Sequence, residues 1–361
     1  MADIEKRITT LLEATQSWLQ ADNHYLMDAI DRTVQEGYFS FEDVQFAIDA
    51  IQKSIDREAI QAWAGEAGLN GGYDHGRTQH QNVLCLHAGN LPLVGFQDAF
   101  STLLSGSRYT GKISRKDPYL LPTFLNEVKK TAIWTGVNVQ WAHRLDDFEG
   151  MQNDAIIFAG SESSVPGVRE AIRKWNLAGQ DCRYLIRTAH FSMAFLDRKE
   201  KRVIEDLVEG IFRYGGKGCR SVALVVSGYS LDEIKSELQE AVHSFWLENP
   251  QHLIPPPGLR QQYAYNEAVE RPQLWLDHFL LQEGGLEFDR DFVSYWVQGD
   301  EETVAELAEQ YERQLQSVYI AHPGVEIQGL ENQTELLGKA QQPSISWKPD
   351  GVDTLAWLVN S

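Results

Sequence analysis

The sequence contains few cysteines, and they lie far apart. Cys85, Cys182 and Cys219 are the only three in the chain. Disulfide-stapled domains and CxxC metal sites need cysteines that are more numerous or more closely spaced. Both classes are therefore excluded, no metal site is expected, and at least one thiol is left for chemistry.

Positive charge and long apolar runs are also scarce. Lys and Arg number 32 against 52 Asp and Glu, giving a formal net charge of -20. Nonspecific binding of nucleic acid or anionic membranes needs a basic surface, so neither partner is expected. No run approaches about 18 apolar residues, and the first residues are charged and amphipathic, unlike a signal peptide. We therefore expect a cytoplasmic protein without membrane insertion.

What is present describes a compact protein with more than one domain. Hydrophobic residues make up 43% of the 361 residues, and no tract is of low complexity. A chain of this length exceeds one ordinary core, so two domains are expected. Residues 1–70 have apolar residues at helical spacing and are predicted to be an N-terminal helical segment, with Ser40 beginning one of its helices.

From residue 71 to 190, short apolar runs alternate with helical segments, which is typical of a parallel sheet with crossover helices. The simplest fold that accounts for this pattern is a doubly wound, nucleotide-binding α/β sheet. Residues 191–345 are predicted to form a second α/β domain, and residues 346–361 a tail that returns to the body. The predicted strands of the first sheet are residues 83–87, 109–113, 137–141, 155–159 and 183–186.

The most informative stretch is residues 212–226 (FRYGGKGCRSVALVV), where a helix runs into glycines, one cysteine and a strand. Glycine lets the backbone turn sharply and lets a substrate approach, which makes Gly218 a candidate substrate contact. Arg213, Lys217 and Arg220 flank Cys219, and nearby positive charge favours the reactive thiolate. The alternative is a buried structural cysteine beside a capping glycine.

Residues 83–95 (VLCLHAGNLPLVG) predict a strand that ends in a turn. Side chains at the carboxyl end of such a strand point into the ligand crevice. Asn90 is there a candidate donor to an oxyanion, and an ordinary turn-forming asparagine is the alternative. His87 is a candidate substrate contact and proton carrier, although a lone histidine is more often a hydrogen-bonded structural residue.

Two further strand ends carry candidate cofactor ligands. Lys112, Ser114 and Arg115 occur in residues 106–118 (GSRYTGKISRKDP), where they are placed to meet a nucleotide ribose or phosphate, with Arg115 as the reader of a 2'-phosphate. Gly160 and Ser161 precede a predicted helix, and the free N–H groups at the start of a helix make them candidate ligands of a pyrophosphate. A solvated basic turn and a simple helix N-cap are the respective alternatives.

Taken in order, these four stretches resemble the aldehyde dehydrogenase superfamily, and most closely its LuxC-like acyl-CoA reductase branch. Residues 347–355 (WKPDGVDTL) are similar to the tail of that branch. The resemblance implies that Cys219 accepts the acyl group and that Asn90 and the Cys219 backbone N–H bind the oxyanion. It also implies that Lys112 and Ser114 meet the adenosine ribose, and that Gly160 and Ser161 lie near the pyrophosphate.

The resemblance implies NADPH-dependent reduction of an acyl thioester, from acyl-CoA or an acyl-carrier protein, to an aldehyde, with NADH as the alternative cofactor. It also implies a homo-oligomer. No Glu-Leu-Gly-Gly motif supplies a base that would activate water, so a thioacyl intermediate is expected to survive hydrolysis. The alternatives are a semialdehyde or acyl-phosphate reductase with the same cysteine chemistry, and a catalytically silent binding protein of this fold.

Overall fold

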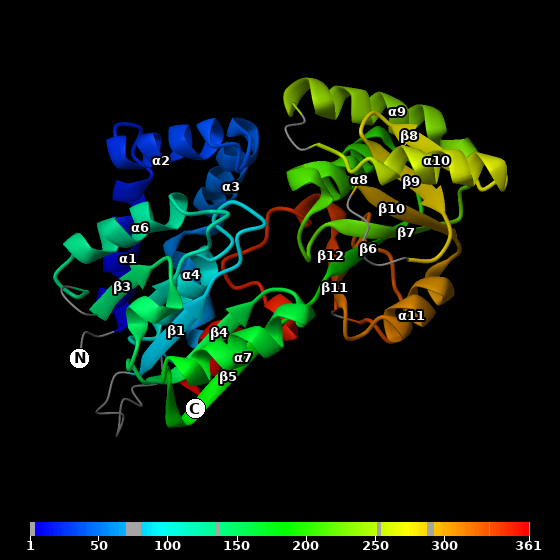
Figure 1. Cartoon of the computed structure of the whole chain (residues 1–361). Helices are drawn as coiled ribbons and strands as arrows, with labels where there is room; N and C mark the ends of the chain where they lie inside the picture. The colour runs from blue at the N-terminus through cyan, green and yellow to red at the C-terminus, as the bar shows by residue number, and fades with distance from the viewer. Residues whose placement is uncertain are drawn as a thin grey trace. The chain divides into compact units, whose positions relative to one another are not determined.

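The computed structural model describes residues 4–69, 81–134, 138–250, 254–286, 292–331 and 333–360. The chain divides into two compact units (Figure 1). Unit 1 comprises Met1–Thr188 and Pro343–Ser361, and unit 2 comprises Ala189–Gln342. Each unit has its own sheet and its own apolar core.

Unit 1 begins with four helices, α1 (Ile4–Trp18), α2 (His24–Gln35), α3 (Phe41–Ser54) and α4 (Arg57–Glu66). Ser40 caps α3 by accepting a hydrogen bond from the backbone N–H of Asp43, and Asp56 caps α4 in the same way. The predicted helical segment is therefore confirmed. Of the boundary loop expected at residues 68–77, only residues 68 and 69 are among those described.

The α/β part of unit 1 contains five parallel strands in the order β3-β2-β1-β4-β5. The predicted sheet is confirmed, although β3 begins at Val139 and residue 137 lies outside the described residues. Its elements are β1 (Asn82–Leu86), α5 (Phe96–Leu104), β2 (Arg108–Lys112), α6 (Leu120–Lys130), β3 (Val139–Ala142), η2 (Leu145–Phe148), β4 (Asn153–Ala159), η3 (Glu162–Ser164), α7 (Val165–Lys174) and β5 (Ala178–Arg187).

Alternate residues of β1 pack on opposite faces of this sheet, as the two-residue period of a strand requires. Val83 and Cys85 join the core that the N-terminal helices, α5 and α6 build. Leu84 and Leu86 join a smaller core with Ile172 of α7, which lies along the other face (Figure 1). Because both faces are covered, the strands are apolar on both sides and the sheet is doubly wound.

Helix α1 shares the larger core directly. The indole Nε1 of Trp18 donates to Thr123 Oγ1 of α6 at 2.7 Å, and its ring stacks on Phe96 of α5. The C-terminal segment also packs on unit 1, where Gln97 Nε2 donates to the carbonyl oxygens of Ile345 and Trp347. This segment includes η6 (Pro349–Gly351) and α12 (Thr354–Val359).

Unit 2 contains a seven-stranded sheet in the order β12-β11-β6-β7-β10-β9-β8, and among the described residues only the β8–β9 pair is antiparallel. The helix, glycine turn and strand predicted across residues 212–226 are confirmed as the end of α8, η4 and β7. The elements are β6 (Phe191–Leu196), α8 (Lys201–Phe212), η4 (Arg213–Gly216), β7 (Val222–Ser227), α9 (Leu231–Glu248), α10 (Gly258–Ala268), β8 (Gln273–Leu276), β9 (Phe279–Glu283), β10 (Val293–Gln298), α11 (Glu301–Gln310), β11 (Leu315–Ile320), β12 (Thr334–Leu336) and η5 (Leu337–Lys339).

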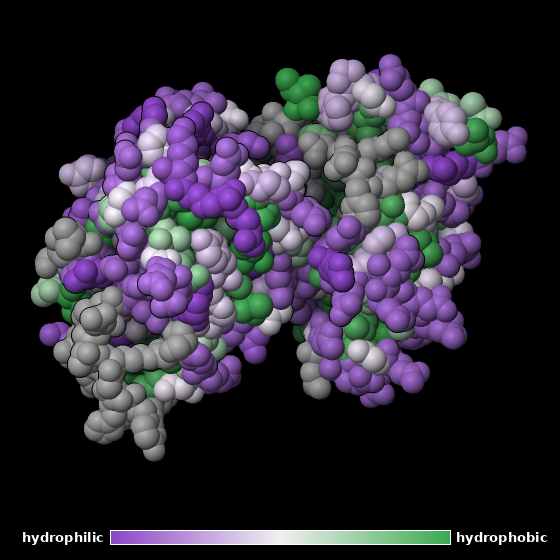
Figure 2. Space-filling view, turned by 60° about the horizontal axis from the view of Figure 1, so that its bottom comes forward, coloured by the Kyte–Doolittle hydropathy of each residue, from purple (hydrophilic) through white to green (hydrophobic). Residues whose placement is uncertain are grey.

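The surface agrees with the acidic composition. On the face drawn in Figure 2, hydrophilic residues cover most of both units, and hydrophobic residues are scattered. Within the described ranges, no helix has the length and apolarity needed to cross a bilayer.

One buried ion pair lies inside unit 1. Arg187, at the end of β5, donates from Nη2 to Asp98 Oδ1 of α5 at 2.6 Å, and both side chains are under 10% exposed. Although burial opposes the charge, the carboxylate raises the pKa of Arg187. Removing one partner of such a pair leaves an uncompensated charge in the core.

We expect Arg187→Ala to lower the free energy of unfolding by about 3–5 kcal/mol, because Asp98 then remains buried and unpaired. Chemical denaturation monitored by tryptophan fluorescence measures the loss. The double variant Asp98→Leu/Arg187→Met should be more stable than Arg187→Ala alone. The coupling would be contradicted if the loss in Asp98→Leu/Arg187→Met equalled the sum of the losses in the single variants Asp98→Leu and Arg187→Met.

Candidate functional site

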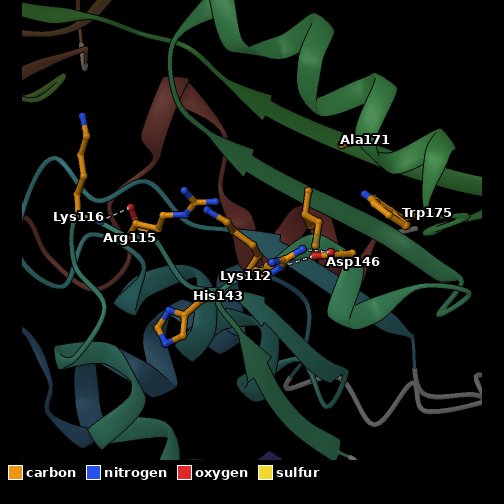
Figure 3. Close-up of a pocket in the computed structure, with 10 residues that line it drawn as sticks. Lys112, Arg115, Lys116, His143, Asp146, Ala171 and Trp175 are labelled. Atoms are coloured by element: carbon orange, nitrogen blue, oxygen red, sulfur yellow. Dashed lines mark hydrogen bonds and ion pairs between the residues drawn. The ribbon is translucent and has the colours of Figure 1, made fainter.

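A concave site of unit 1 lies at the carboxyl ends of β2 and β3. It is a pocket of about 630 Å³ whose wall includes Lys112, Ser114 and Arg115, the three residues predicted to meet a nucleotide. Figure 3 shows the Lys112 and Arg115 side chains beside each other in this pocket. The remaining lining residues are Lys116, His143, Arg144, Leu145, Asp146, Ala171 and Trp175.

The pocket carries positive charge that carboxylates do not neutralise. Among the described residues, Lys112, Arg115 and Lys116 take part in no ion pair. Burial and then the neighbouring Arg115 lower the pKa of Lys112, which means that its charged form is held at a cost. Arg144 is different, because Asp146 binds it through two hydrogen bonds. An anion would relieve the repulsion between Lys112 and Arg115.

Two walls of the pocket were not predicted. His143 and Arg144 follow β3 directly, so the strand-end argument that identified Lys112 applies to them equally. Ala171 and Trp175 come from the carboxyl end of α7, on which Trp175 is the C-cap (Figure 3). No local signal in the sequence relates α7 to the end of β2, because packing of α7 on the sheet makes that contact.

Gly160 and Ser161 follow β4 but do not line this pocket. The N–H of Gly160 donates to the carbonyl oxygen of Arg187, and a Cβ at Gly160 would meet the Phe158 ring at 2.6 Å. The Ser161 hydroxyl interacts with those of Ser163 and Ser164, and it makes no cap bond. This segment therefore offers a ligand the exposed hydroxyl groups before α7. The N–H of Gly160 is not offered, because it already donates to Arg187.

Asn90 lies in the loop after β1 and its side chain is exposed. Gly89, the residue before it, is buried against Ser114, and a Cβ at Gly89 would lie 2.2 Å from Ser114 Oγ. Only glycine allows this approach. The predicted oxyanion donor and the predicted ribose ligand therefore belong to loops that touch.

His87 lies beneath that loop and is 7% exposed. Its Nε2 is 2.6 Å from the Tyr109 hydroxyl, and Gly95 packs on the ring so closely that a Cβ there would lie 2.3 Å from Nδ1. Burial lowers the pKa of His87 to about 4, so the ring is neutral near pH 7. We therefore propose a structural role for His87 in place of the substrate contact expected from the sequence.

In unit 2, Cys219 lies in the predicted turn between α8 and β7 and is partly exposed. The backbone reaches it through four left-handed residues, Tyr214, Gly215, Gly216 and Gly218. Ser192 Oγ donates to the Cys219 carbonyl oxygen at 2.8 Å. The sulfur is thus carried on a turn whose backbone is held in one place.

The arginines beside Cys219 have partners of their own. Arg213 binds Glu209 and donates to Asn249 Oδ1 at 2.7 Å, and Arg220 binds Glu335 and the carbonyl oxygen of Ala340. The sequence predicts that the positive charge of these arginines favours the Cys219 thiolate, and in the structure a carboxylate already binds each of them. Their role in the structure is to anchor the two ends of the turn.

The other two cysteines both belong to unit 1. Cys85 is fully buried, and burial raises its pKa far above the ordinary thiol range. Cys182 is half-buried, and burial raises its pKa to about 11. Across the described ranges, no group of three or more His, Cys, Asp or Glu side chains is placed to hold a metal ion.

The fold places the chain among aldehyde dehydrogenase-like α/β proteins. Aldehyde dehydrogenase 21 from Physcomitrella patens, solved with its product succinate, aligns with a TM-score of 0.70 and 13% identity over 100% of this chain and 84% of that one. An NAD-dependent benzaldehyde dehydrogenase from Corynebacterium glutamicum aligns with a TM-score of 0.58 and 14% identity over 89% and 77%. At these identities the likeness shows the fold alone.

Sequence comparison identifies the family within that class. The model of the acyl-CoA reductase (LuxC) family matches residues 4–321, so the chain belongs to this family. No curated protein matches the chain. Family membership and fold together indicate an oxidoreductase that acts on acyl or aldehyde species.

The buried His87 predicts a pH dependence of stability. An unfolded histidine binds a proton below about pH 6.5, whereas folded His87 does so only below about 4. The unfolded state therefore binds more protons in this window, so stability falls as pH decreases from about 6.5 to 4. We expect wild type to lose about 1 kcal/mol more than His87→Gln between pH 7.5 and 5.5, measured by urea denaturation. Parallel losses in the two proteins would show that His87 is not the cause.

Proposed function

We propose that this protein reduces an acyl thioester of CoA or an acyl-carrier protein to an aldehyde with NADPH, through a thioacyl intermediate on Cys219. Unit 2 supplies the thiol and unit 1 supplies the cofactor site. The observation that carries the proposal is the position of Cys219, a partly exposed residue that follows left-handed glycines and whose carbonyl oxygen accepts a hydrogen bond from Ser192. A structural cysteine needs neither exposure nor such a turn.

The residues of the unit 1 pocket fit a nicotinamide dinucleotide phosphate. Lys112 and Ser114 offer an ammonium and a hydroxyl for ribose oxygens, and Arg115 offers a guanidinium for a 2'-phosphate. Trp175 adds a flat apolar wall. The carboxyl edge of a doubly wound sheet is where nucleotides ordinarily bind. The unneutralised charge of Lys112 and Arg115 supports a ligand with a phosphate in this pocket. Because the pocket is assigned to the adenosine ribose, that phosphate is the 2'-phosphate that NADPH has and NADH lacks.

In the proposed reaction, the Cys219 thiolate attacks the thioester carbonyl and forms a new C–S bond. Asn90 and the backbone N–H of Cys219 stabilise the oxyanion, a contribution of roughly 3 kcal/mol per donor. The carrier departs as a thiolate, leaving the acyl group on Cys219. The reduced nicotinamide, when bound, supplies the hydride. Cys219 then leaves as a thiolate, which frees the aldehyde and restores the starting sulfur.

Hydrolysis of the thioacyl enzyme would waste the acyl group. A general base that activates water contributes typically 10²–10⁴-fold. The sequence contains no Glu-Leu-Gly-Gly motif to supply such a base. The proposed intermediate therefore survives long enough to accept hydride, which favours aldehyde over acid as the product.

Replacing the nucleophile tests the proposal directly. We expect Cys219→Ala to abolish aldehyde formation from acyl-CoA and NADPH and to remove the acyl adduct detected by intact mass spectrometry, because no thiol then accepts the acyl group. NADPH affinity should stay within about threefold of wild type, since the cofactor pocket is untouched. Cys182→Ala, which removes the half-buried thiol of unit 1, is the matched control and should retain activity.

Aldehyde production by Cys219→Ala would refute the proposed nucleophile. A panel of acyl-CoA, acyl-carrier-protein and acyl-phosphate substrates identifies the donor. Turnover with acyl phosphate alone would replace the thioester proposal by that of an acyl-phosphate reductase.

The cofactor assignment has its own test. We expect Arg115→Ala to weaken NADPH binding by roughly tenfold or more, because a charged hydrogen bond to phosphate contributes about 1.5–3 kcal/mol. NADH, which lacks the 2'-phosphate, should lose much less affinity. Isothermal titration calorimetry measures both. The control Arg173→Ala removes an exposed cation of α7 that does not line the pocket. Equal losses for NADPH and NADH would contradict the role given to Arg115.

A further inference from the structure

Two loops of unit 1 meet at the carboxyl edge of the sheet. The turn loop, residues 87–95, joins β1 to α5 and carries Asn90. The pocket loop, residues 113–119, joins β2 to α6 and carries Ser114 and Arg115. Because β1 and β2 are parallel neighbours with Leu86 opposite Lys112, both loops leave the sheet at the same level.

Three contacts hold the loops together. The N–H of His87 donates to the Lys112 carbonyl oxygen at 3.2 Å, which extends the strand pairing. Gly89 packs against Ser114 without room for a side chain. Beyond Asn90, the N–H of Leu93 donates to Asp117 Oδ2 at 2.8 Å. The first two contacts precede Asn90 in the chain and the third follows it, so the backbone is held on both sides of this exposed residue.

Asp117 lowers the stability of the fold at its position. It is 4% exposed, and within the described part of the chain its Oδ1 has no hydrogen-bond partner. Burial raises the pKa of Asp117 to about 6, against the opposing effect of the Leu93 and Leu120 backbone N–H groups. A buried carboxylate with one unsatisfied oxygen destabilises a fold.

The residue that Asp117 holds is strained as well. Leu93 has a φ of 58°, in the left-handed region that a leucine rarely adopts. Backbone strain of this kind costs of order 1–3 kcal/mol and persists only when the surrounding structure imposes it. The strained backbone of Leu93 and a buried carboxylate with one unpaired oxygen thus meet in one hydrogen bond. Such a coincidence is a reason to look for function at the groups that the contact positions.

We propose that Asp117 is a positioning residue that holds Asn90 in register with the pocket of Lys112 and Arg115. The oxyanion donor and the cofactor site then form one preassembled body. This inference rests on the proposed function, because it gives the Asn90 amide a task in the reaction. A role confined to starting α6 would need neither burial of the carboxylate nor a bond to Leu93.

Two substitutions separate positioning from simple stabilisation. Asp117→Ala removes the acceptor of the Leu93 N–H, whereas Asp117→Asn keeps an amide oxygen that can accept the same bond. The control Asp353→Ala removes a carboxylate that caps α12 elsewhere in unit 1, far along the chain from both loops. It should lower the melting temperature without changing the turn loop.

The first measurement is acylation of Cys219 by acyl-CoA, followed by rapid-quench mass spectrometry. We expect Asp117→Ala to lower the acylation rate constant by roughly 10–100-fold. This is less than the loss of rate on removing an oxyanion donor itself, because Asn90 is displaced rather than removed. NADPH affinity should remain within about threefold, because Arg115 and Lys112 stay in place. Asp117→Asn should recover most of the rate, and Asp353→Ala should acylate as wild type does.

The second measurement is amide hydrogen exchange of a peptide that spans the turn loop, which needs no turnover. Exchange should accelerate in Asp117→Ala and stay near the wild-type rate in Asp117→Asn and Asp353→Ala. The proposal is overturned if Asp117→Ala acylates at the wild-type rate, or if Asp117→Asn is as slow as Asp117→Ala. If wild type itself is not acylated, the proposed function fails first; protected exchange in wild type would then show that the loop contact exists without that chemistry.

Discussion

The close approach of Gly89 to Ser114 is the constraint on which the arrangement of unit 1 depends. A single Cβ at Gly89 would lie inside van der Waals distance of the Ser114 hydroxyl, so the loops after β1 and β2 meet only because one of them is glycine at that point. Parallel pairing of the two strands brings both loops to one edge of the sheet. The loop that carries Asn90 and the loop that carries Ser114 and Arg115 of the pocket therefore lie side by side.

Charge is distributed unevenly in a chain whose formal net charge is -20. Arg213 and Arg220, which flank Cys219 in the sequence, are bound by Glu209 and Glu335. In the pocket of unit 1, by contrast, no carboxylate pairs with Lys112 or Arg115 among the residues that the structure describes. The cations of the pocket therefore face a ligand without a paired carboxylate, whereas the two arginines near Cys219 each bind a glutamate.

The turn that presents Cys219 shows how a reactive group is held still. Left-handed glycines bend the chain sharply, and Ser192 binds the Cys219 carbonyl oxygen. Arg220, the next residue, binds the carbonyl oxygen of Ala340 after η5 and the carboxylate of Glu335 in β12. Each contact removes freedom from the backbone, while Cys219 itself stays partly exposed. A preorganised nucleophile of this kind loses little entropy when it meets a substrate, which is the main physical support for the proposed covalent chemistry.

The sequence alone determined the helical N-terminal segment, the strands of the first sheet and the turn before Cys219, because the apolar period distinguishes helices from buried strands and because Ser40 and the glycines act through local backbone geometry. It also placed Lys112 and Arg115 at a strand end. Tertiary structure alone brought Trp175 of α7 into the pocket, buried His87 and joined Asp117 to Leu93. Those contacts link residues distant in the chain, and a local pattern carries no information about which distant group will pack against it.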